Sequence, residues 1–209
     1  GLLAAVPIVG STIPIAVGYA WMNKLKNIKN KTVVFFGEGA TETGVFHESI
    51  GYAALHQIPI IFVCENNLYS VYTHLKDRQS KYRSIKKICE GSGLKYFHGD
   101  GSEIKSVIRV MRKAIDFNNK FKRPIFINFD TYRFLEHCGP NFDDDLNYRD
   151  PNEIKFWKKK DFMNKVTAKN INLKKVEKEI QLEIDNAFKF ARKSKFPTKD
   201  NLDKFIYSK

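Results

Sequence analysis

Three unbroken apolar runs, each five to seven residues long, constrain the fold of this chain most strongly. They are TVVFF at 32–36, IPIIFVC at 58–64 and PIFINF at 124–129. Continuous runs rich in Val, Ile and Phe are typical of strands buried on both faces of a parallel sheet. Segments with helical periodicity occur at about 11–26, 42–56 and 102–120. This alternation predicts an α/β domain with a doubly wound, mostly parallel sheet and helices on both faces.

The pattern changes after Tyr132. A polar loop, RFLEHCGPNFDDDLNYRDP, is followed by two amphipathic segments that predict helices near 151–168 and 172–193. Loops of this length in a compact domain are usually functional or mobile. We therefore expect a single domain over 1–209, with a mobile loop at about 133–150 and a C-terminal helical extension at about 151–209.

Charge and cysteine content narrow the class of protein. The chain has 36 Lys and Arg against 23 Asp and Glu, a formal net charge of +13. The basic residues concentrate after Lys155 and are mixed there with acidic ones, which is typical of a solvated or partner-facing helix surface. Without a zinc-finger spacing or an RNA-binding aromatic motif, we predict no nucleic-acid site. The cysteines, Cys64, Cys89 and Cys138, lack the CxxC spacing of a zinc site or redox motif, and we expect Cys64 to be a small buried hydrophobe.

The opening segment is uncharged up to Asn23 and is then followed by lysines, which could indicate a membrane anchor or a signal sequence. Pro7 and Pro14, with several glycines, break this run into a loop and a short helix. We therefore expect it to be buried in protein and not in lipid. No membrane association is predicted, and a cytoplasmic or organelle-matrix location fits the cysteine usage.

A lone carboxylate, Glu38, stands between Gly37 and Gly39 where the first buried run ends. Ligands of open α/β sheets bind at that edge of the sheet, and glycines allow a ligand to approach the backbone closely. The free amides of Gly39, Ala40 and Thr41 would open a helix and attract a phosphate. Because a carboxylate repels a phosphate, this arrangement calls for a divalent cation between them.

The second apolar run ends in ENNLYS, which provides amide oxygens from Asn66 and Asn67 at the same edge of the sheet. Asn67 follows Glu38 by 67 − 38 = 29 positions, about the length of one helix and one strand. Carboxylate, amide and carbonyl oxygens are ligands that Mg²⁺ accepts. The sequence therefore predicts a magnesium and phosphate site.

This spacing resembles the thiamine-diphosphate motif, GDG followed after 25 to 30 residues by NN. A second GDG, at 99–101, has no asparagine pair at that distance, and we interpret it as a turn between a strand and a helix. Longer stretches extend the resemblance, including GEGATETGVFHESIGYAALHQIPIIFVCENNLYS, RPIFINFDTYRFLEH and YRDPNEIKFWKKKD. The chain resembles the alpha subunits of thiamine-dependent 2-oxo-acid dehydrogenases, the group of pyruvate, branched-chain and acetoin dehydrogenases, nearly from end to end.

The resemblance implies roles for individual residues. Glu38, the amide oxygen of Asn67 and the main-chain carbonyl of Tyr69 would bind Mg²⁺. The diphosphate would lie against Gly37, Gly39 and Ala40. Ile8 and Val9 in PIVGSTIP would support the cofactor rings. His137 would border the diphosphate and the reacting carbon, with Arg133 beside it, as the catalytic pair.

The implied function is to bind the Mg-diphosphate end of thiamine diphosphate in an enzyme that decarboxylates a 2-oxo acid oxidatively and passes the acyl group to a lipoyl-bearing acyltransferase. In this group a beta subunit supplies the activating glutamate, so we expect a hetero-oligomer, α₂β₂, and no activity of the chain alone. Relatives carry about a hundred or more residues, a domain's length, before the point where this chain begins. Leu135 and Cys138 replace a histidine and a regulatory serine that some relatives have in this loop, so control by phosphorylation is not expected there.

Two other functions stay open at this point. The amino-terminal half of a transketolase-like enzyme shares the glycine and asparagine arrangement. A truncated subunit that only scaffolds its partners would also fit. The substrate cannot be assigned from the sequence.

Overall fold

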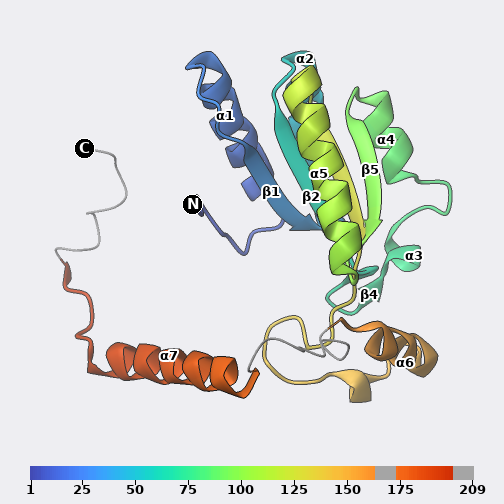
Figure 1. Cartoon of the computed structure of the whole chain (residues 1–209). Helices are drawn as coiled ribbons and strands as arrows, with labels where there is room; N and C mark the ends of the chain where they lie inside the picture. Colours follow the sequence, from blue (N-terminus) through green and yellow to red (C-terminus); the bar gives the residue numbers. More distant parts are fainter. Residues whose placement is uncertain (163–172, 200–209) are drawn as a thin grey trace. The chain divides into compact units, whose positions relative to one another are not determined.

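The computed structural model describes residues 1–162 and 173–199 (Figure 1). The chain divides into two compact units, 1–164 and 165–209, where the sequence suggested one domain. The first unit contains the sheet and the helices around it. The second contains α7 (Leu173–Lys193), which matches the helix expected at 172–193 and buries no residue.

The first unit is built on a four-stranded parallel sheet, as the apolar runs predicted. In spatial order its strands are β1 (Thr32–Gly37), β2 (Ile60–Asn66), β6 (Ile125–Asp130) and β5 (Lys95–Asp100). The predicted runs form β1, β2 and β6. The remaining strand, β5, is expected only as the element before the turn predicted at 99–101, because it lies at the edge of the sheet and buries only Gly99. Gly99 and Asp100 belong to this strand, so the turn begins only at Gly101.

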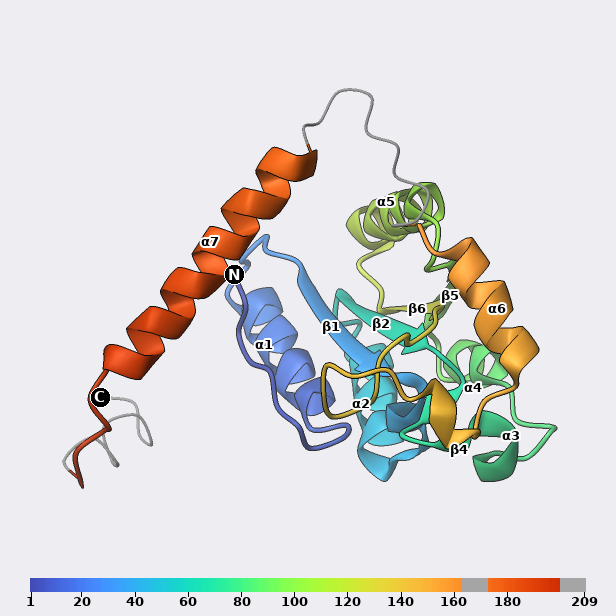
Figure 2. The same cartoon turned by 90° about the horizontal axis from the view of Figure 1, so that it is seen from below.

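Helices cover both faces of the sheet, because each face of β2 is apolar (Figure 2). Ile60, Phe62 and Cys64 face α1 (Thr12–Leu25), α2 (Gly44–Leu55) and α4 (Ile85–Gly91). Ile61 and Val63 face α5 (Ile104–Phe121) on the other side. Each fully buried aliphatic or aromatic side chain contributes about 1.5–3 kcal/mol. The prediction of a doubly wound sheet is confirmed.

The amides that follow Glu38 do not open an α-helix, so that expectation is wrong. They form a 3₁₀ turn, η1 (Glu38–Glu42), and α2 begins only at Gly44. Thr41 Oγ1 donates to the carbonyl of Glu38 at 2.7 Å, which closes the turn. The extended Thr43 then caps α2, since its hydroxyl accepts from the amide of Phe46 at 3.3 Å.

The opening segment is buried only in part. In α1, the residues Ile13, Ala16, Val17 and Ala20 pack into the core. Residues 1–9 are exposed instead, because no described element lies over them. The expectation that the whole segment is buried in protein is therefore wrong for these residues. Within 1–162 and 173–199, no helix has the length and apolar character needed to cross a membrane.

The connections near the site contain elements that the sequence did not predict. Between β2 and β5 lie a short antiparallel hairpin and two helical segments. These are β3 (Tyr69–Ser70), β4 (Thr73–His74), α3 (Leu75–Arg78) and α4. After β6 come η2 (Asp144–Leu146) and α6 (Pro151–Lys160), which is shorter than the expected 151–168. Residues 163–168 of that expected helix lie outside the described part of the chain.

Candidate functional site

Strand register brings the two predicted halves of the site to one edge of the sheet. Gly37, the last residue of β1, pairs with Glu65 near the end of β2. The chain continues from these positions into Glu38 on one side and Asn67 on the other. Parallel strands end at the same edge, so the 28 residues between Glu38 and Asn67 return the chain to that edge on the neighbouring strand.

A cavity of about 250 Å³ at this edge collects residues from distant parts of the sequence. The predicted residues that line it are Ile8, Val9, Gly37, Glu38, Gly39, Ala40, Asn67, Tyr69 and His137. Complete small-molecule sites usually enclose about 300–1,000 Å³, so this cavity is small for a cofactor with two ring systems. Its volume is that of part of a cofactor-binding site.

Glu38 is the buried carboxylate of this cavity, with 4% of its surface exposed. Burial raises its pKa, while the nearby guanidinium of Arg78 acts in the opposite direction. The Nη2 atom of Arg78 lies 2.5 Å from Oε1 of Glu38. Arg78 engages Oε1 and partly neutralises the carboxylate, so Oε2 is the oxygen that would bind a cation in the cavity.

The turn after β2 is held by side-chain amides. Asn67 Oδ1 accepts from the backbone amide of Tyr69 at 2.9 Å. The flanking residues Leu68 and Val71 have positive φ angles of 68° and 53°. Such angles are uncommon outside glycine and are unusual for a β-branched residue, and such strain concentrates at ligand sites.

Ile8 and Val9 reach the cavity through a turn that requires glycine. Gly10 has a φ of +85°, and a β-carbon there would lie 3.0 Å from Oγ1 of Thr43. Ser11 fixes the same turn, because its hydroxyl donates to the carbonyl of Ile8 at 2.8 Å. Ile8 and Val9 stay 72% and 64% exposed, so they form an open apolar wall.

The two predicted catalytic residues lie in different places. His137 lines the cavity from the loop after β6. Arg133 does not line it. Its Nη2 donates to the carbonyl of Val71 at 2.9 Å and to the hydroxyl of Tyr148 at 2.7 Å. Arg133 therefore bonds to the strained turn at Val71 without lining the cavity. The expectation that it stands beside His137 at the reacting atoms lacks structural support.

A buried ion pair holds the loop at 133–150. The guanidinium of Arg149 bonds to the carboxylate of Asp143, and both side chains are almost fully buried. Arg149 also lies over the rings of Tyr132 and Tyr148, 5.2 and 4.8 Å from their centroids. The ring of Tyr148 in turn packs edge-on against Tyr69. The loop is thus connected to the turn after β2, and its mobility stays a prediction.

The donor set fits a cation that shares its shell with a phosphate. Among the described residues, no three His, Cys, Asp or Glu side chains come close enough to hold a metal by themselves. Mg²⁺ commonly takes only one or two carboxylates and completes its shell with phosphate oxygens and water. One carboxylate, one amide and one turn, beside glycines that admit a ligand, match that pattern.

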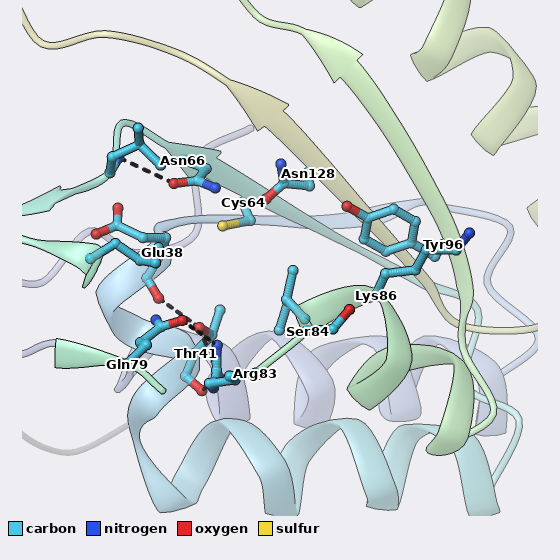
Figure 3. Close-up of a pocket in the computed structure, with 13 residues that line it drawn as sticks. Glu38, Thr41, Cys64, Asn66, Gln79, Arg83, Ser84, Lys86, Tyr96 and Asn128 are labelled. Atoms are coloured by element: carbon cyan, nitrogen blue, oxygen red, sulfur yellow. Dashed lines mark hydrogen bonds between the residues drawn. The ribbon is translucent and has the colours of Figure 1, made fainter. Parts of the chain in front are cut away.

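A second cavity, of about 290 Å³, lies on the other side of Glu38 (Figure 3). Asn66 and Thr41 line it near Glu38, and Tyr96 and Asn128 line it farther away. The Oδ1 atom of Asn128 is buried and has no hydrogen-bond partner within the described ranges. The sequence did not indicate this cavity, because its lining comes from five separate segments.

Other residues of the site also escaped the sequence reasoning. Phe35, Ser70 and Val71 line the first cavity, and Arg78 contacts Glu38. Ser70 and Val71 directly follow Tyr69, so their proximity could have been inferred from the motif. Arg78 lies 40 positions from Glu38, at the end of the four-residue helix α3, and no local pattern signals its contact with Glu38.

The comparisons with known proteins agree with this geometry. A sequence model described as "Dehydrogenase E1 component" matches residues 2–200. The chain belongs to this family. It is 27% identical over 208 residues to the pyruvate dehydrogenase E1 component subunit alpha of Rickettsia bellii. It is also 32% identical over 197 residues to a mitochondrial type II subunit alpha of the same enzyme from Ascaris suum, and 30% identical over 152 residues to a mitochondrial 2-oxoisovalerate dehydrogenase subunit alpha from Arabidopsis thaliana.

This E1 family chain is shorter than these relatives. The matches cover 96%, 90% and 72% of the chain but 63%, 49% and 31% of the relatives. Among solved structures, transketolase from Campylobacter jejuni superposes with a TM-score of 0.53 at 21% identity, covering 62% of this chain and 21% of that one. This likeness concerns the fold alone.

Proposed function

We propose that this chain is the alpha component of a thiamine-diphosphate-dependent 2-oxo-acid dehydrogenase and binds the Mg-diphosphate end of the cofactor. A single observation carries the proposal: all nine residues expected to contact the cofactor line one cavity. Membership of the E1 family supports the reaction class, oxidative decarboxylation with acyl transfer to a lipoyl partner.

Each group in the cavity has a task in this proposal. Glu38 and Asn67, with the carbonyl of Tyr69, bind the Mg²⁺ ion. Gly39 admits the diphosphate to the backbone, since a β-carbon there would already lie 3.3 Å from Ser70 Oγ. When bound, the thiazolium of the cofactor supplies the electron sink for decarboxylation. His137 contributes the imidazole that lines the cavity and is the proposed catalytic group.

A beta subunit completes the site in this proposal. The exposed apolar side chains of Ile8, Val9 and Phe35 border the cavity, and Phe35 is 60% exposed. Exposed apolar groups beside a small cavity are typical of a surface that another protein covers. An α₂β₂ assembly would bury them and supply the groups that activate the cofactor, so the isolated chain should not decarboxylate a 2-oxo acid.

Calorimetry with thiamine diphosphate and Mg²⁺ tests the proposal, using the chain together with its beta subunit. We expect Glu38→Gln to weaken binding more than about 100-fold, since even residues that only support a metal ligand cost about 10–100-fold. Glu65→Gln is the matched control, because it removes an exposed carboxylate at the same sheet edge that does not line this cavity. Absence of any heat of binding in the wild-type complex would favour a scaffolding role.

An activity assay separates the proposal from the transketolase-like alternative. The proposed enzyme releases CO₂ from a 2-oxo acid and reduces an artificial electron acceptor. A transketolase would instead transfer a ketol group between sugar phosphates and release no CO₂. Cofactor binding with only the second activity would overturn the assignment of the reaction.

A further inference from the structure

Arg78, the last residue of α3, joins three parts of the chain beside the cavity. Its Nη2 donates to Oε1 of Glu38 at 2.5 Å. Its Nη1 bonds to the carboxylate of Glu42 at the end of the 3₁₀ turn. Its Nε donates to the carbonyl of Thr73 in β4 at 3.2 Å. The guanidinium is thus held at three points and is only 13% exposed.

These contacts span the two halves of the proposed metal site. Glu38 and Glu42 belong to the turn after β1, whereas Thr73 pairs with Ser70 in the hairpin that also contains Tyr69. The halves lie close together at Gly39, where an added β-carbon would lie 3.3 Å from Ser70 Oγ and 3.7 Å from Arg78 Nη1. The backbone spacing between them therefore depends on the side chain that connects them.

The chemistry of arginine suits a fixed spacer. Its planar guanidinium stays charged at any relevant pH and bonds several acceptors in a rigid geometry, which a flexible lysine ammonium cannot reproduce. The contact engages Oε1 of Glu38, and the carboxylate has a second oxygen, Oε2, for another cation. Glutamate has one more rotatable bond than aspartate, so its orientation needs such a constraint more.

We propose that Arg78 is a positioning residue of the metal site, which fixes the spacing between Glu38 and the Tyr69 hairpin and thereby favours Mg²⁺ over larger cations. The inference rests on the proposed function. Mg²⁺ requires near-octahedral oxygens at about 2.0–2.1 Å, whereas Ca²⁺ accepts about 2.3–2.6 Å and irregular geometry. A site whose halves move apart should lose Mg²⁺ affinity first and Ca²⁺ affinity less.

The experiment measures thiamine diphosphate binding by calorimetry, with the chain in complex with its beta subunit, once in Mg²⁺ and once in Ca²⁺. We expect Arg78→Gln to weaken binding in Mg²⁺ by about 10–100-fold, the range for residues that support a metal ligand. The loss in Ca²⁺ should be several-fold smaller. Arg78→Lys should not restore the preference for Mg²⁺, because lysine cannot make the three contacts. Lys81→Gln is the control for lost charge, since Lys81 is exposed on the same connection and contacts the Tyr82 ring.

Each outcome is decisive. Equal losses in Mg²⁺ and Ca²⁺, or unchanged binding, would overturn the positioning role and leave the proposed function intact. Tighter Mg²⁺-dependent binding by Arg78→Gln would also overturn it, because Arg78 would then compete with the metal. If the wild type binds the cofactor neither in Mg²⁺ nor in Ca²⁺, both the positioning role and the proposed function are overturned. If Arg78→Gln does not fold, Glu42→Ala removes one of the three contacts. We then expect a smaller loss of binding that is again larger in Mg²⁺ than in Ca²⁺.

Discussion

Asn66 and Asn67 are neighbours in the sequence, but their side chains line different cavities. Each accepts a hydrogen bond from the backbone amide two residues later, Asn66 from Leu68 at 3.1 Å and Asn67 from Tyr69 at 2.9 Å. The two residues therefore make the same kind of local contact. They differ in which cavity they face, because side chains at the end of a strand alternate in direction.

This difference gives a matched pair of substitutions. We expect Asn67→Ala to weaken Mg²⁺-dependent binding of thiamine diphosphate by more than about tenfold, since it removes a proposed metal ligand. Asn66→Ala removes an equivalent turn contact and should leave that affinity within about threefold, because a hydrogen bond of this kind contributes about 0.5–1.5 kcal/mol to stability only. Calorimetry on both variants checks this. Equal losses in affinity would mean that turn stability, and not ligation, explains the effect.

The turn at Gly10 gives a second pair. Gly10→Ala should lower the free energy of unfolding by about 1–3 kcal/mol, because alanine is strained at φ +85° and its β-carbon meets Thr43 and Val45. Gly18→Ala, in the exposed face of α1 with open space around it, should raise stability by about 0.5–1 kcal/mol. Urea unfolding measures both. Stabilisation by Gly10→Ala would contradict the requirement for glycine in this turn.

The ion pair between Arg149 and Asp143 should contribute to the stability of the loop at 133–150. Asp143→Asn removes the charge that bonds to the buried guanidinium of Arg149 and leaves Asp144, at 3.8 Å, as its weaker partner. We expect a loss of about 3 kcal/mol, the lower end of the range for a broken buried ion pair. Asp145→Asn, exposed in the same loop, should change stability by less than about 0.5 kcal/mol. The midpoints of denaturant unfolding compare the two. Similar small effects would show that the buried pair does not hold the loop.

Asp100 and Lys160 give a prediction about pH. Burial raises the pKa of Asp100, but hydrogen bonds with Lys160 and Ser102 together lower it by more. The net pKa therefore lies below the usual 3.8. Because the pKa of Asp100 is lower in the folded than in the unfolded state, its ionised form stabilises the fold at pH values above the unfolded-state pKa. This stabilisation is lost as the pH falls through the folded-state pKa. Lys160→Gln should therefore raise the pKa of Asp100 and shift acid unfolding to higher pH. NMR titration of the Asp100 carboxyl checks the shift, and an unchanged pKa would rule out Lys160 as its cause.

Tyr69 connects the turn after β2 to α6. Its hydroxyl donates to Oε2 of Glu153 at 2.7 Å, in a half-buried environment. Tyr69→Phe should cost about 1.5–3 kcal/mol of stability, the range for hydrogen bonds to charged groups. Its affinity for the cofactor should change little, because the proposed ligand is the backbone carbonyl. Tyr82→Phe, at an 83% exposed position, is the control. A large loss of affinity without a loss of stability would give the hydroxyl a direct role in binding.

Much of the fold follows from local sequence. The runs at 58–64 and 124–129 became the central strands β2 and β6, because they are apolar on both faces and helices cover both faces. The run at 32–36 became the edge strand β1, where Phe35 stays 60% exposed. Glu38 and Asn67 could be paired because a helix and a strand return the chain to the same edge. The details of the turn after Glu38 could not be predicted, since the choice between a 3₁₀ turn and an α-helix depends on hydrogen bonds of Thr41 and Thr43.

The sequence by itself determined the sheet, its main helices, the family, and the residues gathered at one cavity, because periodicity and motif spacing are local properties of the chain. Only the tertiary structure decided that Arg78 contacts Glu38, that Arg133 bonds to the turn after β2 without lining the cavity, and that Asn66 and Asn67 face different cavities. The arginine contacts join segments that are distant in sequence, and the two asparagines differ only in the direction of their side chains. Their energies depend on burial and geometry, which exist only once the chain has folded.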